Sequence, residues 1–562
     1  MKKQLNPKEI AEASIALLEE IHHLLELKGE NPFKIRAFEK AAKNLSGQLD
    51  LKERAQNGTL TEITGIGKGI AEILVEFILK GTSQARDELL ASLPQGLIEL
   101  TRVPGLGPKR ALQLIEALEV HSLSELEYAC RENRLIKLKG FGEKVQQKIL
   151  EGIRFLNAGQ GQIRLGDALG VAEKLLPLLL TVANSGRHPL VEKLRVSETG
   201  ALRRRSEILS ELEFLVEVPP GEKLSAQIRK QVEERVEQFR SEENFSLPIR
   251  FIYSIPTQFG YALAQTTGTD RHWRALKSPA PFEALTENEF YRSLDLPWIW
   301  PEAREAGEEV ALARQGQLKE LLLDDGVRGV FHNHTSWSDG EATVEEMVIA
   351  AKSLGYQYIG ISDHSQSAFY AHGLGLDELL KQEREIRSVQ EKHPEIRIFW
   401  GIESDILQDG SLDYEAKILK RFDFTVASVH SRFKMDKGTM TARILKAIRN
   451  PHTRFLGHAT GRLLLGRPGY DVDMEALIIE AAKCNVAIEI NSHPSRLDID
   501  WRWGGALREH QTWVSINPDA HEVAGLRDVR FGIMMARKAL LPTSQVVNSK
   551  GVKEVGQWLN QK

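Results

Sequence analysis

The sequence predicts a multidomain protein that combines α+β and α/β units, with a helical N-terminal third and a C-terminal α/β barrel. Three observations predict this class. The chain has 562 residues, which is too long for one hydrophobic core, so three or more units are expected. A Gly-apolar-Gly turn occurs three times in the N-terminal third. From residue 326 to the end, short apolar strands alternate with helices, and polar side chains follow the strands.

The composition is that of an ordinary globular protein. The formal net charge of −4 does not by itself indicate a nucleic-acid partner, although a mean hides differences between regions. Cys130 and Cys484, the two cysteines, lie far apart and outside any metal-binding spacing, which suits a reducing compartment. The first residues lack the apolar stretch of a signal peptide, and no apolar run is long enough to span a bilayer. A cytoplasmic protein with no membrane partner is expected.

The N-terminal region is predicted to be helical. Residues 7–48 carry apolar side chains at helical spacing, with a break at 28–32 where Gly and Pro occur. The repeated turn then occupies residues 63–68, 103–109 and 138–144, and amphipathic helices are expected after it at 70–79, 111–118 and 145–153.

These turns are suited to binding a nucleic-acid backbone. Two glycines let the chain turn tightly between helices, while the apolar residue between them enters the core. Free N–H groups at the start of the next helix can then bind a phosphate oxygen, and a nearby lysine adds charge. One such turn is equally well explained as a plain connection, but three copies favour sequence-independent DNA binding. The residues predicted to contact DNA are Gly65, Gly67, Lys68, Gly105, Gly107, Lys109, Gly140, Gly142 and Lys144.

The turns look like helix-hairpin-helix motifs, and their layout resembles the N-terminal region of family X DNA polymerases, including residues 27–38. In some members of that family this small domain carries a lysine for lyase chemistry. The matching position here is Ile73, so lyase activity is not expected. The resemblance continues through residues 160–320 and implies a palm and a thumb. Gly200, Arg203 and Arg204 stand in the loop that grips the nucleotide in the family.

The palm departs from the family where metal ions would bind. Family members carry two Asp on one strand and a third carboxylate on a neighbouring strand, and these hold two divalent ions for nucleotidyl transfer. Here Glu211 and Glu213 replace the two Asp, Ala201 replaces the loop serine, and the best alignment puts Arg250 at the third position. Mg²⁺ tolerates little change in geometry, and a cation repels it. We therefore expect no Mg²⁺ in the palm, which is predicted to be catalytically inactive, with both Glu residues on the exposed face of a half-buried strand.

The C-terminal region places candidate metal ligands just after its strands. His332 and His334 are one residue apart, so on an extended chain both can reach one ion. Any single histidine of this kind is also explained as a hydrogen-bonded core residue. Ligands that follow successive parallel strands, however, converge at one mouth of an α/β barrel. Imidazole and carboxylate groups without thiolate suit Zn²⁺, Mn²⁺ or Fe²⁺.

The order His-x-His, Asp-His-Ser, Gly-x-Glu, Ser-x-His, Gly-His and Asp-Ala-His resembles the polymerase-and-histidinol-phosphatase (PHP) family over this whole region. The resemblance implies a distorted (β/α)7 barrel that binds up to three divalent ions. The first ion would be held by His332, His334, Glu403 and Asp519, a second by Glu403, His430 and His458, and a third by Asp339, His364 and His521. Asp339 stands where other members of the family have His.

Further residues are assigned from the same resemblance. Glu403, which would bridge two ions, and Arg462 are the residues predicted to be catalytic. Two alternatives remain open for Arg462 and Arg496, which either meet a phosphate or pair with acidic neighbours. The residues expected to orient metal ligands are Asp363, Asp405 and Asn491, while His493 has no assigned role.

Five regions are expected. They are a helical DNA-end-binding domain (1–85), a helix-hairpin-helix domain that resembles the fingers (86–158), the degenerate palm (159–255), a thumb-like region with a linker (256–325) and the PHP domain (326–562). The hydrophobic stretch 296–301 is expected to pack against the last of them. Since each unit can bury its own core, a monomer is expected.

The leading hypothesis is a DNA-binding, metal-dependent phosphoesterase, acting as a 3′–5′ exonuclease or 3′-end-processing enzyme in DNA repair on gapped or 3′-ended DNA. The first alternative is an active family X polymerase in which Glu211 and Glu213 bind metal and the PHP site proofreads. The second is a DNA-end scaffold without enzymatic activity. A small-molecule phosphatase also remains open, although the three hairpins argue against it.

Overall fold

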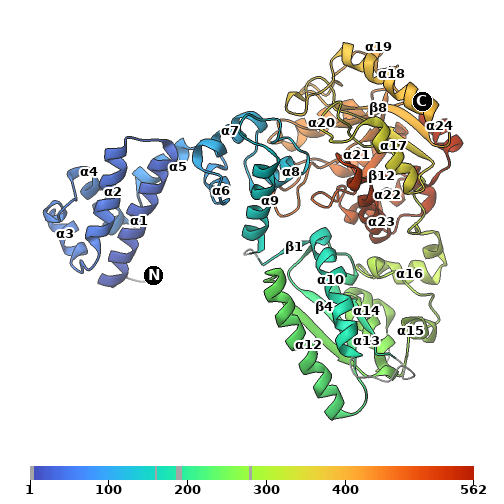
Figure 1. Ribbon diagram of the computed structural model, residues 1–562, viewed down its shortest axis with the longest axis horizontal. Helices are drawn as coiled ribbons and strands as arrows, with labels where there is room; N and C mark the ends of the chain where they lie inside the picture. The colour runs from blue at the N-terminus through green and yellow to red at the C-terminus, as the bar shows by residue number, and fades with distance from the viewer. Residues whose placement is uncertain (1–5, 159–160, 185–192, 278–280, 562) are drawn as a thin grey trace. The chain divides into compact units, whose positions relative to one another are not determined.

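The computed structural model describes residues 6–158, 161–184, 193–277 and 281–561 (Figure 1). The chain divides into two compact units, Met1–Leu126 and Glu127–Lys562. The division falls inside the region predicted to span 86–158, and the predicted domain boundaries stay predictions. Within the described ranges, no helix is long and apolar enough to cross a membrane.

The first unit is helical, and its start follows the sequence pattern. Helix α1 (Pro7–Lys28) begins with a capping box between Asn6 and Glu9 and ends at Gly29, whose φ of 71° is the left-handed conformation that stops a helix. Helix α2 follows from Pro32 to Leu45, so the predicted break is confirmed. The remaining elements are α3 (Leu51–Asn57), η1 (Leu60–Glu62), α4 (Lys68–Lys80), α5 (Gln84–Ser92), α6 (Leu97–Leu100) and α7 (Pro108–Leu118), and α8 (Leu123–Arg131) leads into the second unit.

The three repeated turns share one geometry. Their first glycines, Gly65, Gly105 and Gly140, have φ angles of 86°, 83° and 92°, which a residue with a side chain rarely adopts. The apolar residue between the glycines is buried in each turn, at Ile66, Leu106 and Phe141. Its amide donates over 3.0 Å to the carbonyl oxygen three residues earlier in all three copies. Helices α4, α7 and α9 (Glu143–Ala158) then begin within three residues, as predicted.

The palm region is built on a small mixed sheet. Strands β2 (Val196–Thr199), β4 (Leu212–Glu217) and β5 (Ile249–Ser254) lie in the order β2-β4-β5, with β4 antiparallel to β2 and parallel to β5. Helices α10 (Leu165–Ala183) and α12 (Glu222–Glu243) pack against each other beside it. The short elements are β1 (Ile163–Arg164), α11 (Gly200–Arg203) and β3 (Ile208–Leu209).

One expectation for this sheet is wrong. Glu213 does not lie on an exposed strand face, because every residue of β4 is buried. Its carboxylate pairs with the guanidinium of Arg250, the residue directly opposite on β5. Arg250 Nε also lies 3.9 Å from Glu211 Oε2. Burial of the carboxylate is thus compensated by an ion pair that the strand pattern alone does not reveal.

The thumb-like region connects the palm to the barrel. It contains η2 (Pro256–Gln258), α13 (Phe259–Thr267), α14 (Asp270–Leu276), α15 (Glu287–Ser293), η3 (Pro301–Ala303), α16 (Glu308–Arg314) and η4 (Gln317–Glu320). Trp300, in the hydrophobic stretch, lies under the guanidinium of Arg537 at 4.0 Å from the ring centroid. Arg537 belongs to helix α23 (Val529–Lys538) of the C-terminal region, so the predicted packing of this stretch is confirmed.

The C-terminal region is a parallel barrel of seven strands. Its strands, in the order β6 to β12, are β6 (Gly329–Val330), β7 (Tyr358–Ile361), β8 (Arg397–Asp405), β9 (Phe424–Ser428), β10 (Thr453–Leu456), β11 (Ala487–Asn491) and β12 (Val514–Asn517). A parallel bridge from Asn333 to Ala520 links the chain after β6 to the chain after β12, so the barrel is nearly closed. Both the barrel and its strand number agree with the expected (β/α)7 fold.

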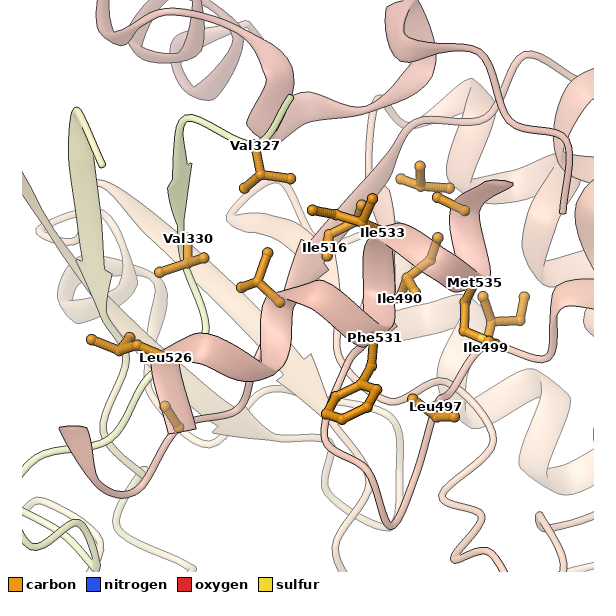
Figure 2. Packing of buried hydrophobic residues seen from close by; sticks show 14 of the residues in the cluster. Val327, Val330, Ile490, Leu497, Ile499, Ile516, Leu526, Phe531, Ile533 and Met535 are labelled. Carbon is orange, nitrogen blue, oxygen red and sulfur yellow. The ribbon is translucent and has the colours of Figure 1, made fainter. Parts of the chain in front are cut away.

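Helices connect the strands and cover the barrel. In chain order they are α17 (Val344–Ser353), α18 (Leu376–Lys392), α19 (Ala416–Leu419), α20 (Lys437–Ile448), α21 (Met474–Lys483), α22 (Gly504–Glu509), α23 (Val529–Lys538) and α24 (Val552–Asn560). Helix α23 packs on β11 and β12, where Ile533 and Met535 share a buried cluster with Ile490 and Ile516 (Figure 2). Such burial of apolar area provides most of the driving force for folding.

Candidate metal centre

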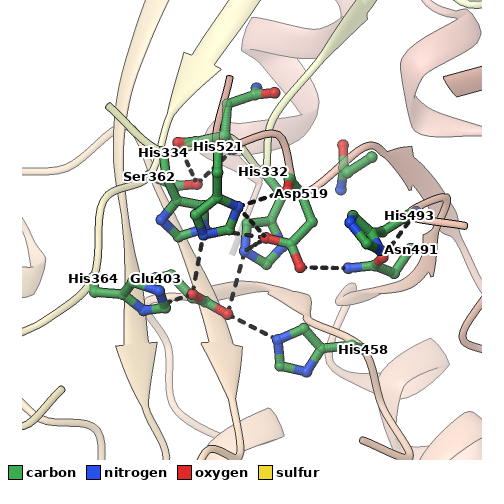
Figure 3. A network of polar contacts seen from close by, with 12 residues as sticks. His332, His334, Ser362, His364, Glu403, His458, Asn491, His493, Asp519 and His521 are labelled. Atoms are coloured by element: carbon green, nitrogen blue, oxygen red, sulfur yellow. Dashed lines mark hydrogen bonds and ion pairs between the residues drawn. The ribbon is translucent and has the colours of Figure 1, made fainter. Parts of the chain in front are cut away.

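The candidate ligands sit at the carboxyl ends of the barrel strands (Figure 3). His332 and His334 follow β6, His364 follows β7, and Glu403 lies near the end of β8. The others come from the loops after β6, β9, β10 and β12, and they are Asp339, His430, His458, Asp519 and His521. The structure thus brings together all nine residues predicted to bind metal, because parallel strands present their carboxyl ends at one mouth of the barrel.

Within this group, several subsets are close enough to share an ion. Their ligand atoms lie within 4.8 Å of one another in four sets, which are His332, His334 and Asp519; His332, Glu403 and His458; His364, Glu403 and His430; and His334, Asp339, His364 and His521. The sets overlap with the three predicted ion sites. They differ in that His364 approaches Glu403 as well as Asp339.

Glu403 occupies the centre of the cluster. Its Oε1 lies 3.2 Å from His332 Nε2, 3.2 Å from His430 Nε2 and 3.0 Å from His458 Nε2. Its Oε2 lies 2.9 Å from His364 Nδ1 and 3.6 Å from His334 Nε2. A carboxylate with both oxygens directed at different imidazoles is suited to bridging two cations.

The charges of the cluster also suit cations. Burial disfavours protonation of His332, but Glu489, Asp519 and Glu403 outweigh it and raise its pKa. Burial and the neighbouring His521 and His364 lower the pKa of His334 to about 3. Burial favours the neutral form of Asp339, yet His364 and His521 outweigh it and lower its pKa. Neighbouring imidazoles and carboxylates of the cluster therefore share a small number of protons. Divalent ions would displace these protons when they bind.

Several buried polar atoms of the cluster have no hydrogen-bond partner among the described residues. They include His332 Nε2, both ring nitrogens of His334 and His364, Asp339 Oδ2, Glu403 Oε2 and His521 Nε2. Buried polar atoms are otherwise almost always satisfied. Imidazole nitrogens and carboxylate oxygens left in this state are the donor set of Zn²⁺, Mn²⁺ or Fe²⁺, so the residues present fit such ions.

Residues outside the ligand set hold it in place. Asp363 accepts hydrogen bonds from the Thr335 amide at 2.7 Å and from Ser338 Oγ at 2.6 Å, and so fixes the loop that carries Asp339. Asp405 Oδ1 lies 2.6 Å from His430 Nδ1. Asn491 donates to Asp519 Oδ2 over 3.0 Å. These contacts agree with the orienting roles expected for Asp363, Asp405 and Asn491.

The sequence reasoning gave no role to Glu489, which has one here. Its Oε1 lies 2.8 Å from His332 Nδ1, and its Oε2 accepts the His458 amide at 2.7 Å. Burial of a carboxylate is costly unless it has a partner, so the position of Glu489 inside the fully buried strand β11 was the signal that could have indicated its role. Tyr128 and Arg134 were also missed. The Tyr128 hydroxyl donates to Asp519 Oδ2 over 3.3 Å, and Arg134 Nε lies 3.5 Å from Asp339 Oδ2.

The two arginines with open roles differ in position. Arg462 bonds to Asp500 at 2.7 Å and to the Arg496 carbonyl oxygen at 3.0 Å, so acidic and main-chain partners occupy its guanidinium. Its predicted catalytic role stays a prediction. Arg496 Nε lies 3.7 Å from Asp519 Oδ2, within the cluster. His493 lies edge-on to Tyr128, and burial lowers its pKa to about 3.

The remaining predicted site residues lie elsewhere. Lys68, Lys109 and Lys144 are exposed beside their turns, as a contact with DNA requires. In the palm loop, Gly200 has a φ of 59° and lies against Glu213. Arg203 pairs with Glu287 and Arg204 with Glu305. The two arginines expected to grip a nucleotide thus have internal carboxylate partners.

Comparisons with known proteins cover most of the chain. Family models match residues 12–83 (helix-hairpin-helix domain), 97–154 (SAM-like helix-hairpin-helix tandem) and 331–493 (PHP domain). The DNA polymerase/3′-5′ exonuclease PolX of Bacillus subtilis is 32% identical over 97% of this chain and 98% of its own length. A probable phosphatase of Caldicellulosiruptor saccharolyticus is 35% identical over 29% of this chain and 64% of its own length.

A solved structure is also similar in part. The histidinol phosphate phosphatase of Lactococcus lactis, determined with zinc, L-histidinol and phosphate, is 17% identical with a TM-score of 0.29 and covers 37% of this chain and 93% of its own. Taken together, the turns, the barrel and its ligand cluster define a protein that joins helix-hairpin-helix elements to a PHP domain. More particularly, the chain belongs to the bacterial PolX family.

Proposed function

We propose that this protein is a DNA-binding, metal-dependent phosphoesterase that acts on DNA 3′ ends as a 3′–5′ exonuclease or end-processing enzyme in repair. The observation that carries the proposal is the convergence of nine imidazole and carboxylate side chains at one barrel mouth, eight of them buried and the ninth, His430, half-buried. The helix-hairpin-helix turns of the same chain support DNA as the substrate, because they are suited to phosphate backbones.

In this proposal the chain's own residues hold and orient the reacting groups. Glu403, Asp339, Asp519 and the six histidines of the cluster would hold the ions, and Glu489 and Asp405 hold His332 and His430 in position. Bound Zn²⁺, Mn²⁺ or Fe²⁺ would activate a water molecule and neutralise charge on the phosphoryl group. Arg496, beside Asp519, adds a positive charge at the edge of the site.

The palm is proposed to be a scaffold without nucleotidyl-transfer activity. Arg250 faces Glu213 and lies near Glu211, so a cation stands where a third metal-binding carboxylate is needed. Ions that require octahedral oxygen ligands are repelled by such a group. The internal partners of Arg203 and Arg204 support the same proposal.

The experiment is digestion of a 5′-labelled primer–template with Mn²⁺. The wild type is expected to shorten the primer, whereas His332→Ala/His334→Ala is expected to bind less metal and to lose cleavage, because both imidazoles belong to the cluster. His372→Asn is the matched control, since His372 is exposed, outside every ligand set, and at a positive φ that Asn tolerates. A purified wild type that binds no metal and hydrolyses nothing would instead identify a scaffold. Cleavage of small phosphate esters but not DNA would identify a phosphatase.

A further inference from the structure

A segment from outside the barrel covers the metal centre. Residues 127–137, called here the capping segment, follow the start of helix α8 and precede the third hairpin turn. Tyr128 donates its hydroxyl hydrogen to Asp519 Oδ2 and accepts a hydrogen bond from Arg496 Nε at 3.1 Å. At the other end, Lys137 Nζ donates to the Ser338 carbonyl oxygen over 2.7 Å. The capping segment is therefore anchored to the barrel on both sides of its turn.

Local backbone structure fixes the direction of the Arg134 side chain, which lies between these two anchors. Asn133 has a φ of 53°, and the Arg134 amide donates to the Ala129 carbonyl oxygen over 3.0 Å. This pattern ends a helix tightly and gives the next residue one orientation. Gln146 donates to Asn133 Oδ1 over 2.7 Å and holds the turn from the other side.

Arg134 is directed into the ligand cluster. Its side chain is only 13% exposed, its Nε lies 3.5 Å from Asp339 Oδ2, and its guanidinium lies 4.3 Å from the centroid of the Tyr370 ring. Glu132, 2% exposed, pairs with the guanidinium and places its Oε1 3.7 Å from His521 Nε2. Among the residues that the structure describes, Arg134 Nε has no hydrogen-bond partner, and stacking on an aromatic ring leaves the planar N–H groups directed sideways.

A cavity lies between the third hairpin and the barrel, beside Glu132, although Arg134 is not among its lining residues. It has a volume of about 730 Å³ and is lined by Glu132 and Lys144 from the hairpin region and by His493, Asp519 and His521 from the barrel. Lys144 is one of the residues predicted to contact the DNA backbone. A strand held at the third turn therefore has a continuous space towards two of the candidate metal ligands.

We propose that Arg134 is a substrate-binding residue of the metal centre, whose guanidinium binds the phosphoryl oxygens of the DNA end. The inference rests on the proposed phosphoesterase function and deepens it. A guanidinium forms paired hydrogen bonds with phosphate oxygens, and a bound phosphate would share the Arg134 guanidinium with Glu132 and Asp339. The substrate phosphate is thus bound from two sides, by the barrel and by the hairpin region.

The experiment compares full-length wild type, Arg134→Gln and Arg134→Lys after loading with Mn²⁺. Metal content, thermal midpoint, affinity for inorganic phosphate by calorimetry, and KM and kcat on the 5′-labelled primer–template are measured. Arg397→Gln, an exposed change of the same charge in the barrel, is the control. Phosphate affinity is expected to fall about 10- to 100-fold in Arg134→Gln with unchanged metal content, because a charge-assisted hydrogen-bonded contact is lost.

The possible outcomes separate the two proposals. If the wild type hydrolyses DNA and Arg134→Gln binds phosphate equally well, only the role of Arg134 is overturned. Faster hydrolysis by Arg134→Gln would also overturn it, because Arg134 would then be blocking the site. If the wild type neither binds Mn²⁺ nor hydrolyses DNA, the phosphoesterase function itself fails. Should Arg134→Gln not fold, Arg134→Lys keeps the charge without the planar fork and is expected to bind phosphate several-fold more weakly.

Discussion

At the scale of the residue, hydrogen bonds to carboxylates select one nitrogen in two imidazoles of the cluster, His332 and His430. His332 Nδ1 faces Glu489, so Nε2 is the nitrogen directed at Glu403 and Asp519. His430 is held in the same way by Asp405. A carboxylate behind an imidazole fixes the ring and makes its other nitrogen a better metal ligand.

Glu489→Gln is expected to weaken metal binding without unfolding the barrel. The amide keeps the size of the side chain but removes the negative charge beside His332 Nδ1. Its NH2 group, if turned towards the His458 amide, would place two hydrogen-bond donors against each other. Metal affinity is expected to fall about 10- to 100-fold, measured by titration of the chelator-treated protein with Mn²⁺. Glu480→Gln, a partly exposed carboxylate on α21 that pairs with Arg449, is the control. Equal affinity of both variants would refute an orienting role for Glu489.

Residues of the site were predictable where their signal is local. The nine candidate ligands follow strands or lie in short motifs, so their positions after the strands indicated a metal site, and the resemblance to the PHP family selected these nine. Tyr128 and Arg134 carry no such signal, because they are brought to Asp519 and Asp339 only by tertiary packing. Arg462 shows the opposite case. It lies in a motif that resembles the PHP family, but its guanidinium bonds to Asp500.

At the scale of the element, the barrel strands are packed around glycines. Gly360 on β7 and Gly401 on β8 both face the Phe424 ring of β9. Phe424 in turn packs edge-on against Phe331 and Phe455, at 5.3 Å and 5.6 Å between ring centroids. The glycines leave the space that these large rings need, since protein interiors have few voids to spare.

Gly401→Ala is expected to destabilise the barrel. A Cβ atom at this position would lie 2.3 Å from Phe424 Cζ, and the ring is enclosed by other aromatic side chains. Overpacking of this kind costs about 1–3 kcal/mol of the free energy of unfolding. Thermal unfolding measured by calorimetry should show a lower midpoint. Gly170→Ala in α10 is the control, because nothing lies within 4 Å of its Cβ position and alanine favours a helix, so its midpoint should not fall.

Elements with a strong local signal were predicted well. The three hairpin turns follow from their glycines and apolar residues, because φ preference and burial act within a few residues. Strand β4 was predicted as half-buried, and the structure shows it fully buried. The pairing of Glu213 with Arg250 explains the difference, since it joins residues on two strands and leaves no periodic pattern in either.

At the scale of the whole molecule, the second unit combines a palm and a barrel. Their contacts include Lys538 Nζ donating to the Arg204 carbonyl oxygen at 2.9 Å and Trp501 Nε1 donating to Glu207 at 3.1 Å. Arg164 Nε likewise donates to the Leu464 carbonyl oxygen over 3.1 Å. A palm fixed in this way can serve the barrel as support even without its own chemistry. The order of the domains was predictable from family resemblance, whereas these contacts were not.

The palm is expected to incorporate no nucleotides. The test gives dNTPs and Mg²⁺ or Mn²⁺ to the His332→Ala/His334→Ala variant on a primer–template, so that cleavage cannot hide extension. No extension is expected, because Arg250 pairs with Glu213 and approaches Glu211, and a guanidinium repels the two ions that nucleotidyl transfer requires. Glu211→Ala in the same background should change nothing. Template-dependent extension that Glu211→Ala abolishes would mean that the two Glu residues hold metal and that Arg250 moves away from them when a nucleotide binds. The protein would then be a polymerase in which the PHP site removes what the palm adds.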